Sequence, residues 1–102
     1  MSIKLVVLYP QPVDEQLFER VYHGQHMPLM RSLVAPSSRL RTYRVRMPNG
    51  APFYRMAEVD FADVAQLEAF ATSEGGRAAR HSATQASTGG ETRILICEQD
   101  PQ

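Results

Sequence analysis

Apolar residues follow two different patterns in the stretches that predict β-strands. Residues 3–9 and 92–98 are apolar almost without interruption, which is typical of strands covered on both faces. Residues 40–47 and 53–61 instead alternate between apolar and polar side chains, the period of half-solvated strands. Pro48-Asn49-Gly50-Ala51-Pro52 separates them as a strong turn cluster, so the two alternating stretches predict a hairpin with residues 40–47 near a sheet edge.

A helical period follows the first strand, from residue 15 to about residue 33. Its apolar stripe comprises Phe18, Tyr22, His26, Leu29 and Leu33. Asp14 suits the N-cap, and Val13 before it is placed to pack onto Phe18. Pro28 removes a backbone donor and pushes against the carbonyl of Gly24, which costs about 3 kcal/mol inside a regular helix. We therefore expect a kink or short break near Gly24. Because the apolar spacing resumes after the proline, a kinked helix that continues to about Leu33 is favoured over a full stop.

A second helical region begins at residue 63, where Asp63 and Gln66 resemble a capping box. Its expected inner face consists of Val64, Leu67, Phe70 and Ala71, and the helix is expected to end near residue 73. Gly75-Gly76 is expected to interrupt it. Residues 77–86 are again permissive for helix, and Thr88-Gly89-Gly90 breaks the chain before the last strand.

The resulting order, β-α-β-β-α-β, predicts a ferredoxin-like α+β fold in one domain, residues 1–102, with a frayed tail at residues 100–102. Four antiparallel strands then carry both helices on one face. We place residues 3–9 at the centre of the sheet. The second central strand is expected to be residues 92–98 or the strand next to it. Because helices cover only one face, leaving Val6 and Leu8 wet on the other would forfeit roughly 1.5 to 3 kcal/mol per large side chain. A homodimer that pairs the sheets is expected.

Charge and cysteine content exclude several kinds of binding partner and an internal disulfide. Eleven basic and eleven acidic residues cancel without a block of like charge, which argues against binding to nucleic acid or an anionic membrane. Cys97, the single cysteine, excludes an internal disulfide and is expected to be a small buried apolar residue. The apolar run at residues 5–9 is too short for a signal peptide or a membrane span, so a cytoplasmic protein is expected.

The sequence lacks the motifs of several classes of protein. Gly75-Gly76 and Gly89-Gly90 do not have the spacing or the preceding strand of a nucleotide-binding loop. Cys97 lies within a strand and no serine occupies an exposed elbow, so nucleophilic catalysis has no support. An RNA-recognition module shares the strand order, but its stacking aromatics are missing from residues 53–61.

Several segments together carry a family resemblance over nearly the whole chain. They are residues 3–10, residues 18–29 with His26-Met27-Pro28-Leu29, Gly50-Ala51-Pro52-Phe53-Tyr54, Ser73-Glu74-Gly75 and Thr88-Gly89-Gly90. Together they resemble the EthD family, named from ethyl tert-butyl ether degradation. The resemblance implies a dimeric α+β barrel, in which two sheets close into a barrel with helices outside. The family pattern of an aromatic residue followed by His-x-Pro-Leu falls on Tyr22, His26, Pro28 and Leu29.

His26 is the main chemical candidate, because it occupies an apolar slot of its helix. It could be structural, hydrogen-bonded to a carbonyl that Pro28 leaves free or to a tyrosine. It could instead line a cleft between helix and sheet and exchange a proton with an organic ligand, with Tyr22 orienting or assisting it. Haem or metal ligation is a third alternative, although His23 and His26 alone are too few ligands for a closed zinc site.

Other residues are candidates for the lining of the same pocket. They are Phe18, Leu29, Tyr43, Tyr54 and Glu58. Glu58 lies within a strand, where it either faces water, pairs with an arginine such as Arg44, or acts as an acid–base group in the barrel lumen. His81 lies in a polar, Ala/Ser-rich helix and is expected at the surface.

The combined prediction is a small-molecule-binding protein that works without a cofactor. It would act as an oxidoreductase, or a related catalyst such as an oxygenase or isomerase, on a small organic compound in a catabolic pathway, with His26 transferring a proton. The alternative is a non-catalytic ligand-binding or accessory protein in which His26 is structural.

Overall fold

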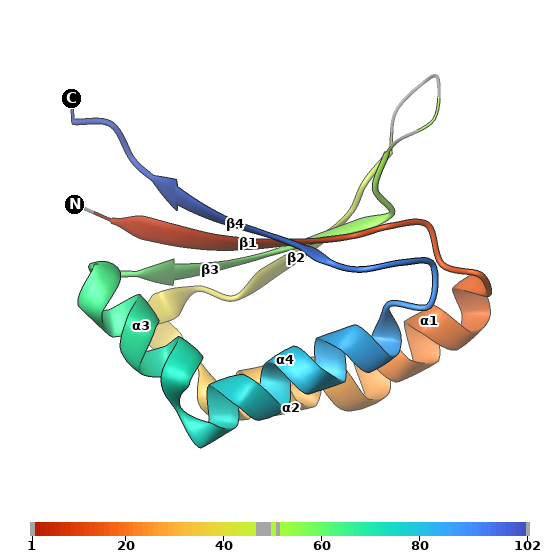
Figure 1. The fold of residues 1–102 in the computed structure, drawn as a ribbon, viewed down its shortest axis with the longest axis horizontal. Helices are drawn as coiled ribbons and strands as arrows, with labels where there is room; N and C mark the ends of the chain where they lie inside the picture. Colours follow the sequence, from red (N-terminus) through yellow and green to blue (C-terminus); the bar gives the residue numbers. More distant parts are fainter. Residues whose placement is uncertain (1, 47–49, 51, 102) are drawn as a thin grey trace.

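A computed structural model of the chain describes residues 2–46, 50 and 52–101. A twisted four-stranded antiparallel sheet carries a layer of helices on one face (Figure 1). The elements are β1 (Ile3–Tyr9), α1 (Glu15–Val21), η1 (Tyr22–His26), α2 (Met27–Leu33), η2 (Pro36–Ser38), β2 (Arg41–Arg44), β3 (Arg55–Phe61), α3 (Val64–Thr72), α4 (Glu74–Ala86) and β4 (Arg93–Glu98). The predicted order of strands and helices is therefore confirmed.

The strands lie side by side in the order β2-β3-β1-β4. β1 and β3 form the centre, with Ile3 opposite Phe61 and Tyr9 opposite Arg55. β2 lies at one edge as predicted, and its backbone pairing with β3 continues through a 2.9 Å hydrogen bond from Val45 N to Tyr54 O. β4 lies at the other edge, so the neighbour β3, and not the apolar strand β4, is the second central strand.

The first helical segment contains a turn of π-helix where a break was expected. Asp14 caps α1 as predicted, since its carboxylate accepts a 3.1 Å hydrogen bond from Leu17 N. In η1 the amide of Met27 bonds to the carbonyl of Tyr22, five residues back. This wider turn accommodates Pro28, which has no amide to donate and whose ring would press on the preceding turn of a regular helix. The helical segment therefore continues through η1 into α2 and ends at Leu33, as predicted.

The first helix of the second helical region, α3, ends at Thr72 with Ser73 as its C-cap, close to the predicted end near residue 73; the interruption predicted at Gly75-Gly76 is wrong. The Ser73 hydroxyl caps α4 by accepting a 2.9 Å hydrogen bond from Gly76 N, and both glycines lie inside this helix. A Cβ built at Gly76 would come within 1.9 Å of the carbonyl oxygen of Phe70. The glycine is needed because the end of α3 packs directly on the start of α4, which outweighs its weak helix propensity.

The two faces of the sheet differ in composition. Alternate residues of β1 point toward the helices, where Ile3 and Tyr9 join buried clusters with Phe18, Val59 and Leu67. The opposite face, which we call the open face, has no helix over it. Its register pairs are Lys4 with Asp60, Val6 with Glu58, and Leu8 with Met56, flanked by Tyr43 of β2 and Leu95 of β4.

Two sequence predictions about burial are wrong. Cys97 is exposed because β4 is an edge strand, and its neighbours Leu95 and Ile96 are 46% and 62% exposed. Val13 is 84% exposed and therefore does not pack onto the buried Phe18. His81 is exposed as expected. The predicted strand residue Met47 and most of the turn at residues 48–52 lie outside the described residues.

Candidate functional site

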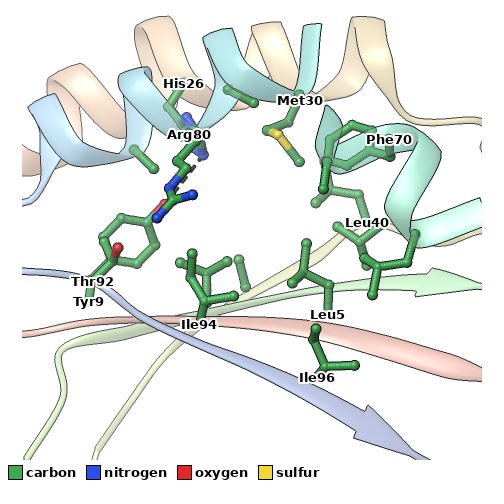
Figure 2. A pocket seen from close by; sticks show the side chains of 18 of the residues that line it. Leu5, Tyr9, His26, Met30, Leu40, Phe70, Arg80, Thr92, Ile94 and Ile96 are labelled. Carbon is green, nitrogen blue, oxygen red and sulfur yellow. Dashed lines mark hydrogen bonds between the residues drawn. The ribbon is translucent and has the colours of Figure 1, made fainter. Parts of the chain in front are cut away.

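A cavity of about 260 Å³ separates the helices from the sheet (Figure 2). Its apolar wall comes from elements distant in sequence: Leu5 of β1, Met30 of α2, Leu40, Phe70 of α3, and Ile94 and Ile96 of β4. At one end of the cavity the lining becomes polar, with Tyr9, His26, Arg80 and Thr92. An apolar enclosure with a few convergent polar groups is typical of a small-molecule site.

The cavity lies where the helices carry small side chains. Ala71 of α3 and Gly76, Ala79 and Ala83 of α4 line it, and the last three are buried. A larger residue at these positions would fill the space between α4 and the sheet. The alanine-rich sequence of α4, which alone indicates only a permissive helix, therefore creates the pocket.

His26 is buried at the polar end, with a partner on each ring nitrogen. Its Nε2 lies 3.3 Å from the hydroxyl of Tyr9, and its Nδ1 lies 3.1 Å from Oγ of Ser82 on α4. A neutral imidazole has one donor and one acceptor. With the proton on Nδ1, the ring donates to Ser82 and accepts from Tyr9; the other tautomer reverses both bonds. Each tautomer thus satisfies both contacts.

Burial determines the protonation of this pair. Desolvation lowers the pKa of His26, which keeps the imidazole neutral at neutral pH. Desolvation also raises the pKa of Tyr9, so that its hydroxyl retains its proton. A neutral histidine beside a protonated tyrosine can accept a proton at one atom and donate a hydrogen bond at the other.

Local structure positions these groups precisely. Tyr9 ends β1, and its carbonyl accepts a 2.7 Å hydrogen bond from Tyr54 N, which fixes the strand end. His26 ends the π-helical turn η1, and its ring lies 5.5 Å from that of Tyr22. Ser82 follows Ala79 by three residues, which places it about one helical turn further along the same face of α4. The pair is therefore held by a strand and two helical segments.

Of the residues predicted from sequence to act or to line the pocket, only His26 lines this cavity. Tyr22 is buried beside His26, but its hydroxyl meets Oγ1 of Thr42 at 2.8 Å. Phe18 and Tyr54 are also fully buried, and Phe18 packs against both tyrosine rings at centroid distances of 5.1 and 5.2 Å. These three aromatic side chains fill the interior and leave no space around themselves.

The other predicted lining residues also lie elsewhere. Leu29 is half-buried on α2, and Tyr43 is 40% exposed on the open face. Glu58 lies on the open face too, where its carboxylate is 2.7 Å from Nζ of Lys4 and 3.7 Å from Arg41. The hydrogen bond from Lys4 lowers the pKa of Glu58. Pairing with an arginine of the neighbouring strand was one of the alternatives for Glu58. That arginine is Arg41 and not Arg44, the example suggested, which pairs with Glu15 at 3.3 Å.

Tyr9, Ser82 and Arg80 were missed in the sequence. For Tyr9 a signal existed, because residues 3, 5, 7 and 9 share one strand face and the aromatic ring ends it. Ser82 follows Ala79 by three residues, so it falls on the face that also carries Ala83 and Ala86. Neither position could be connected to His26 without the register of the fold.

Within the part of the chain that the structure describes, no three or more His, Cys, Asp or Glu side chains gather in a way that could hold a metal ion. The described helices also include none with both the length and the apolar character that crossing a membrane requires.

Comparison with solved structures finds close relatives in fold. A crystal structure of an ethyl tert-butyl ether degradation (EthD) family protein from Bacillus halodurans C-125 is 31% identical, with 98% of this chain and 100% of that chain covered and a TM-score of 0.85. A dimeric ferredoxin-like protein of unknown function from Jannaschia sp. CCS1 is 18% identical, with 97% and 100% covered and a TM-score of 0.76. Hydroxynitrile lyase from Passiflora edulis is 13% identical, with 98% and 97% covered and a TM-score of 0.69.

These similarities confirm the ferredoxin-like α+β fold predicted from the sequence. No protein with a curated description matches the chain. The sequence model of the EthD domain matches residues 10–86, a span that contains the π-helical turn, the hairpin and α4. Together with the Bacillus halodurans relative, which is covered in full, this match shows that the chain belongs to the EthD family.

Proposed function

We propose that this protein binds a small, mainly apolar organic molecule in the cavity between helices and sheet, and that His26 exchanges a proton with it. The observation that carries the proposal is the neutral His26–Tyr9 pair at the polar end of an otherwise apolar cavity. The activity would be that of a cofactor-independent oxidoreductase, or a related catalyst such as an isomerase, in the breakdown of an organic compound.

The chemistry follows from burial. Apolar walls remove water from the ligand, and electrostatic interactions with His26 and Tyr9 are then stronger than in solution. When Tyr9 turns its hydroxyl from His26 toward an oxygen of the ligand, Nε2 of His26 is free to accept a proton from the ligand. The Tyr9 hydroxyl then donates a hydrogen bond that stabilises the negative charge developing on that oxygen. Tyr22 does not line the cavity, and we assign it the positioning of the His26 ring through the contact between their rings.

One observation favours a second candidate, a non-catalytic ligand-binding protein. Both ring nitrogens of His26 already have hydrogen-bond partners, Tyr9 and Ser82. A buried histidine satisfied in this way can be purely structural. In that case the cavity would bind the same class of ligand without transferring a proton.

The test begins with native mass spectrometry and a visible absorption spectrum of the purified protein. A retained organic mass would support the binding proposal and identify a compound for turnover assays; a Soret band would contradict the cofactor-free proposal. With the compound in hand, His26→Gln should retain binding and lose turnover by about 10²–10⁴-fold if His26 transfers the proton. Equal turnover in wild type and His26→Gln would overturn the catalytic role, and binding without any turnover would favour the second candidate.

We also propose that the protein is a homodimer whose open faces meet as a barrel. The open face combines apolar side chains with the ion pair of Lys4 and Glu58, and on the edge strand β4 the side chain of Leu95 is 46% exposed there. Covering such a face by a second copy removes apolar surface from water. The dimeric ferredoxin-like relative from Jannaschia is consistent with this arrangement.

The dimer is tested by light scattering after size-exclusion chromatography. Leu95→Arg should shift the protein toward monomer, because two buried guanidinium groups would face each other across the interface. Gln85→Arg, on the exposed side of α4, is the matched control and should leave the mass unchanged. A monomeric wild type would overturn the proposal.

A further inference from the structure

Arg80 places a positive charge at the polar end of the cavity. It belongs to α4, and Figure 2 shows its side chain extending from the helix toward the sheet at the end of the cavity where His26, Tyr9 and Thr92 lie. The other charged residue of the lining is Glu68 of α3. Because His26 and Tyr9 are neutral, Arg80 is the group that gives this end of the cavity its charge.

The charge of Arg80 is not matched by a carboxylate of the described residues. Arg41, Arg44 and Arg55 each lie within 4.0 Å of a carboxylate, on Glu58 and Asp60, Glu15, and Glu19, respectively. Arg80 has no such partner among residues 2–46, 50 and 52–101, and Glu68 is therefore not its partner either. Arg80 is an exposed residue, so its guanidinium lies at the rim of the cavity. A guanidinium at the rim of an apolar cavity, without a carboxylate beside it, is suited to bind an anionic group.

We infer that the ligand is a small organic acid, whose anionic group binds Arg80 while its apolar body packs on Leu5, Met30, Phe70 and Ile94. This inference rests on the proposed function and names its substrate class. The cavity of about 260 Å³ lies just under the range of roughly 300–1,000 Å³ for drug-sized ligands, so the acid is small. His26 and Tyr9 lie at the same end as Arg80, which brings the proton transfer close to the acid group.

The inference is tested with pairs of acids and neutral amides of the same shape. The probes are phenylacetate with phenylacetamide, and cyclohexanecarboxylate with cyclohexanecarboxamide. Binding is measured by isothermal titration calorimetry, and its location by amide chemical shifts of the cavity-lining residues. Wild type should bind each acid about tenfold or more tightly than its amide, and added salt should reduce this difference.

Arg80→Gln should weaken acid binding by about ten- to a hundredfold and change amide binding by less than about twofold. Arg20→Gln is the matched control, since Arg20 is an exposed arginine of α1 that does not line the cavity. It should leave all four affinities unchanged. Circular dichroism of each variant verifies that the fold is intact, which is expected because both arginine side chains are exposed.

The outcomes separate the two proposals. If acids and amides bind in the cavity with equal affinity, or if Arg80→Gln keeps the preference for acids, the inference about Arg80 is overturned and the binding site stands. If neither acids nor amides shift the resonances of the lining residues, the proposed function fails and the inference fails with it.

Discussion

The space between the helices and the sheet is filled by side chains on one side, beneath α1, and is hollow on the other side, beneath α4. Beneath α1, the side chains of Phe18, Tyr22 and Tyr54 are at most 2% exposed and stack on each other and on Tyr9. Beneath α4, Ala79 and Ala83 face the same sheet and leave a cavity. Buried apolar residues lie on both sides, so the position of a pocket in this fold depends on side-chain volume and not on hydrophobicity alone.

The largest expected difference comes from one change made on both sides, phenylalanine to alanine. Phe18→Ala should cost about 3–5 kcal/mol of unfolding free energy, because the ring is fully buried among aromatic neighbours. Phe70→Ala should cost only about 1–2 kcal/mol, because Phe70 is half-buried and already borders the cavity. Urea unfolding followed by circular dichroism gives both values.

Equal losses for these two variants would contradict the comparison, since they would mean that Phe70 is as tightly packed as Phe18. The slope of the free energy against urea concentration serves as the control. It should be the same for both variants and for wild type if the unfolded states are equally exposed.

Local patterns were sufficient to predict most of the fold. The caps at Asp14 and Asp63 and the order of elements follow from short-range features, and the structure confirms them. The strand predicted at residues 53–61 is found at residues 55–61, but it is buried or half-buried throughout and not half-solvated, because β3 is a central strand. The errors involve tertiary contacts. Gly76 is retained inside α4 because Phe70 approaches it, and β4 lies at an edge although its sequence is as apolar as that of a central strand.

The candidate site was predictable only in part, through His26 on the inner stripe of its helix. A helical stripe identifies which face is buried, but not whether the space beside it is filled. Phe18 and Tyr54, which were expected to line a pocket, fill the interior instead, and Tyr43 lies exposed on the open face. Tyr9 and Ser82 contact His26 from 17 and 56 residues away in sequence, so only the register of β1 and the docking of α4 bring them together.

The pH dependence of stability offers a second way to examine the boundary between the two sides, where His26 lies. Burial lowers its pKa below the usual histidine value of 6.5, so the unfolded chain binds more protons than the folded one between the two pKa values. Stability should therefore fall as the pH drops through about 6.5, by at most roughly 1.4 kcal/mol per pH unit for this one group.

His26→Gln should remove this part of the pH dependence, while His81→Gln, at an exposed histidine of α4, should leave it unchanged. Urea unfolding between pH 5 and 8 gives the free energy of unfolding of the wild type and of both variants. A wild-type stability that is flat across this interval, or one that rises as the pH falls, would contradict the assignment of His26 as a buried neutral group.

The smallest stability effect is expected where a leucine enters the hollow side. Ala79→Leu places three additional carbons beside the cavity and should change the unfolding free energy by less than about 1 kcal/mol, since burying the new atoms offsets their crowding. Ala86→Leu makes the same change on the same helix at a residue that is 1% exposed and packs with the aromatic cluster, and it should cost about 1–3 kcal/mol. Thermal unfolding monitored by circular dichroism ranks the two variants. The reverse order would mean that the empty space lies beneath the aromatic residues, and would move the ligand site away from Arg80.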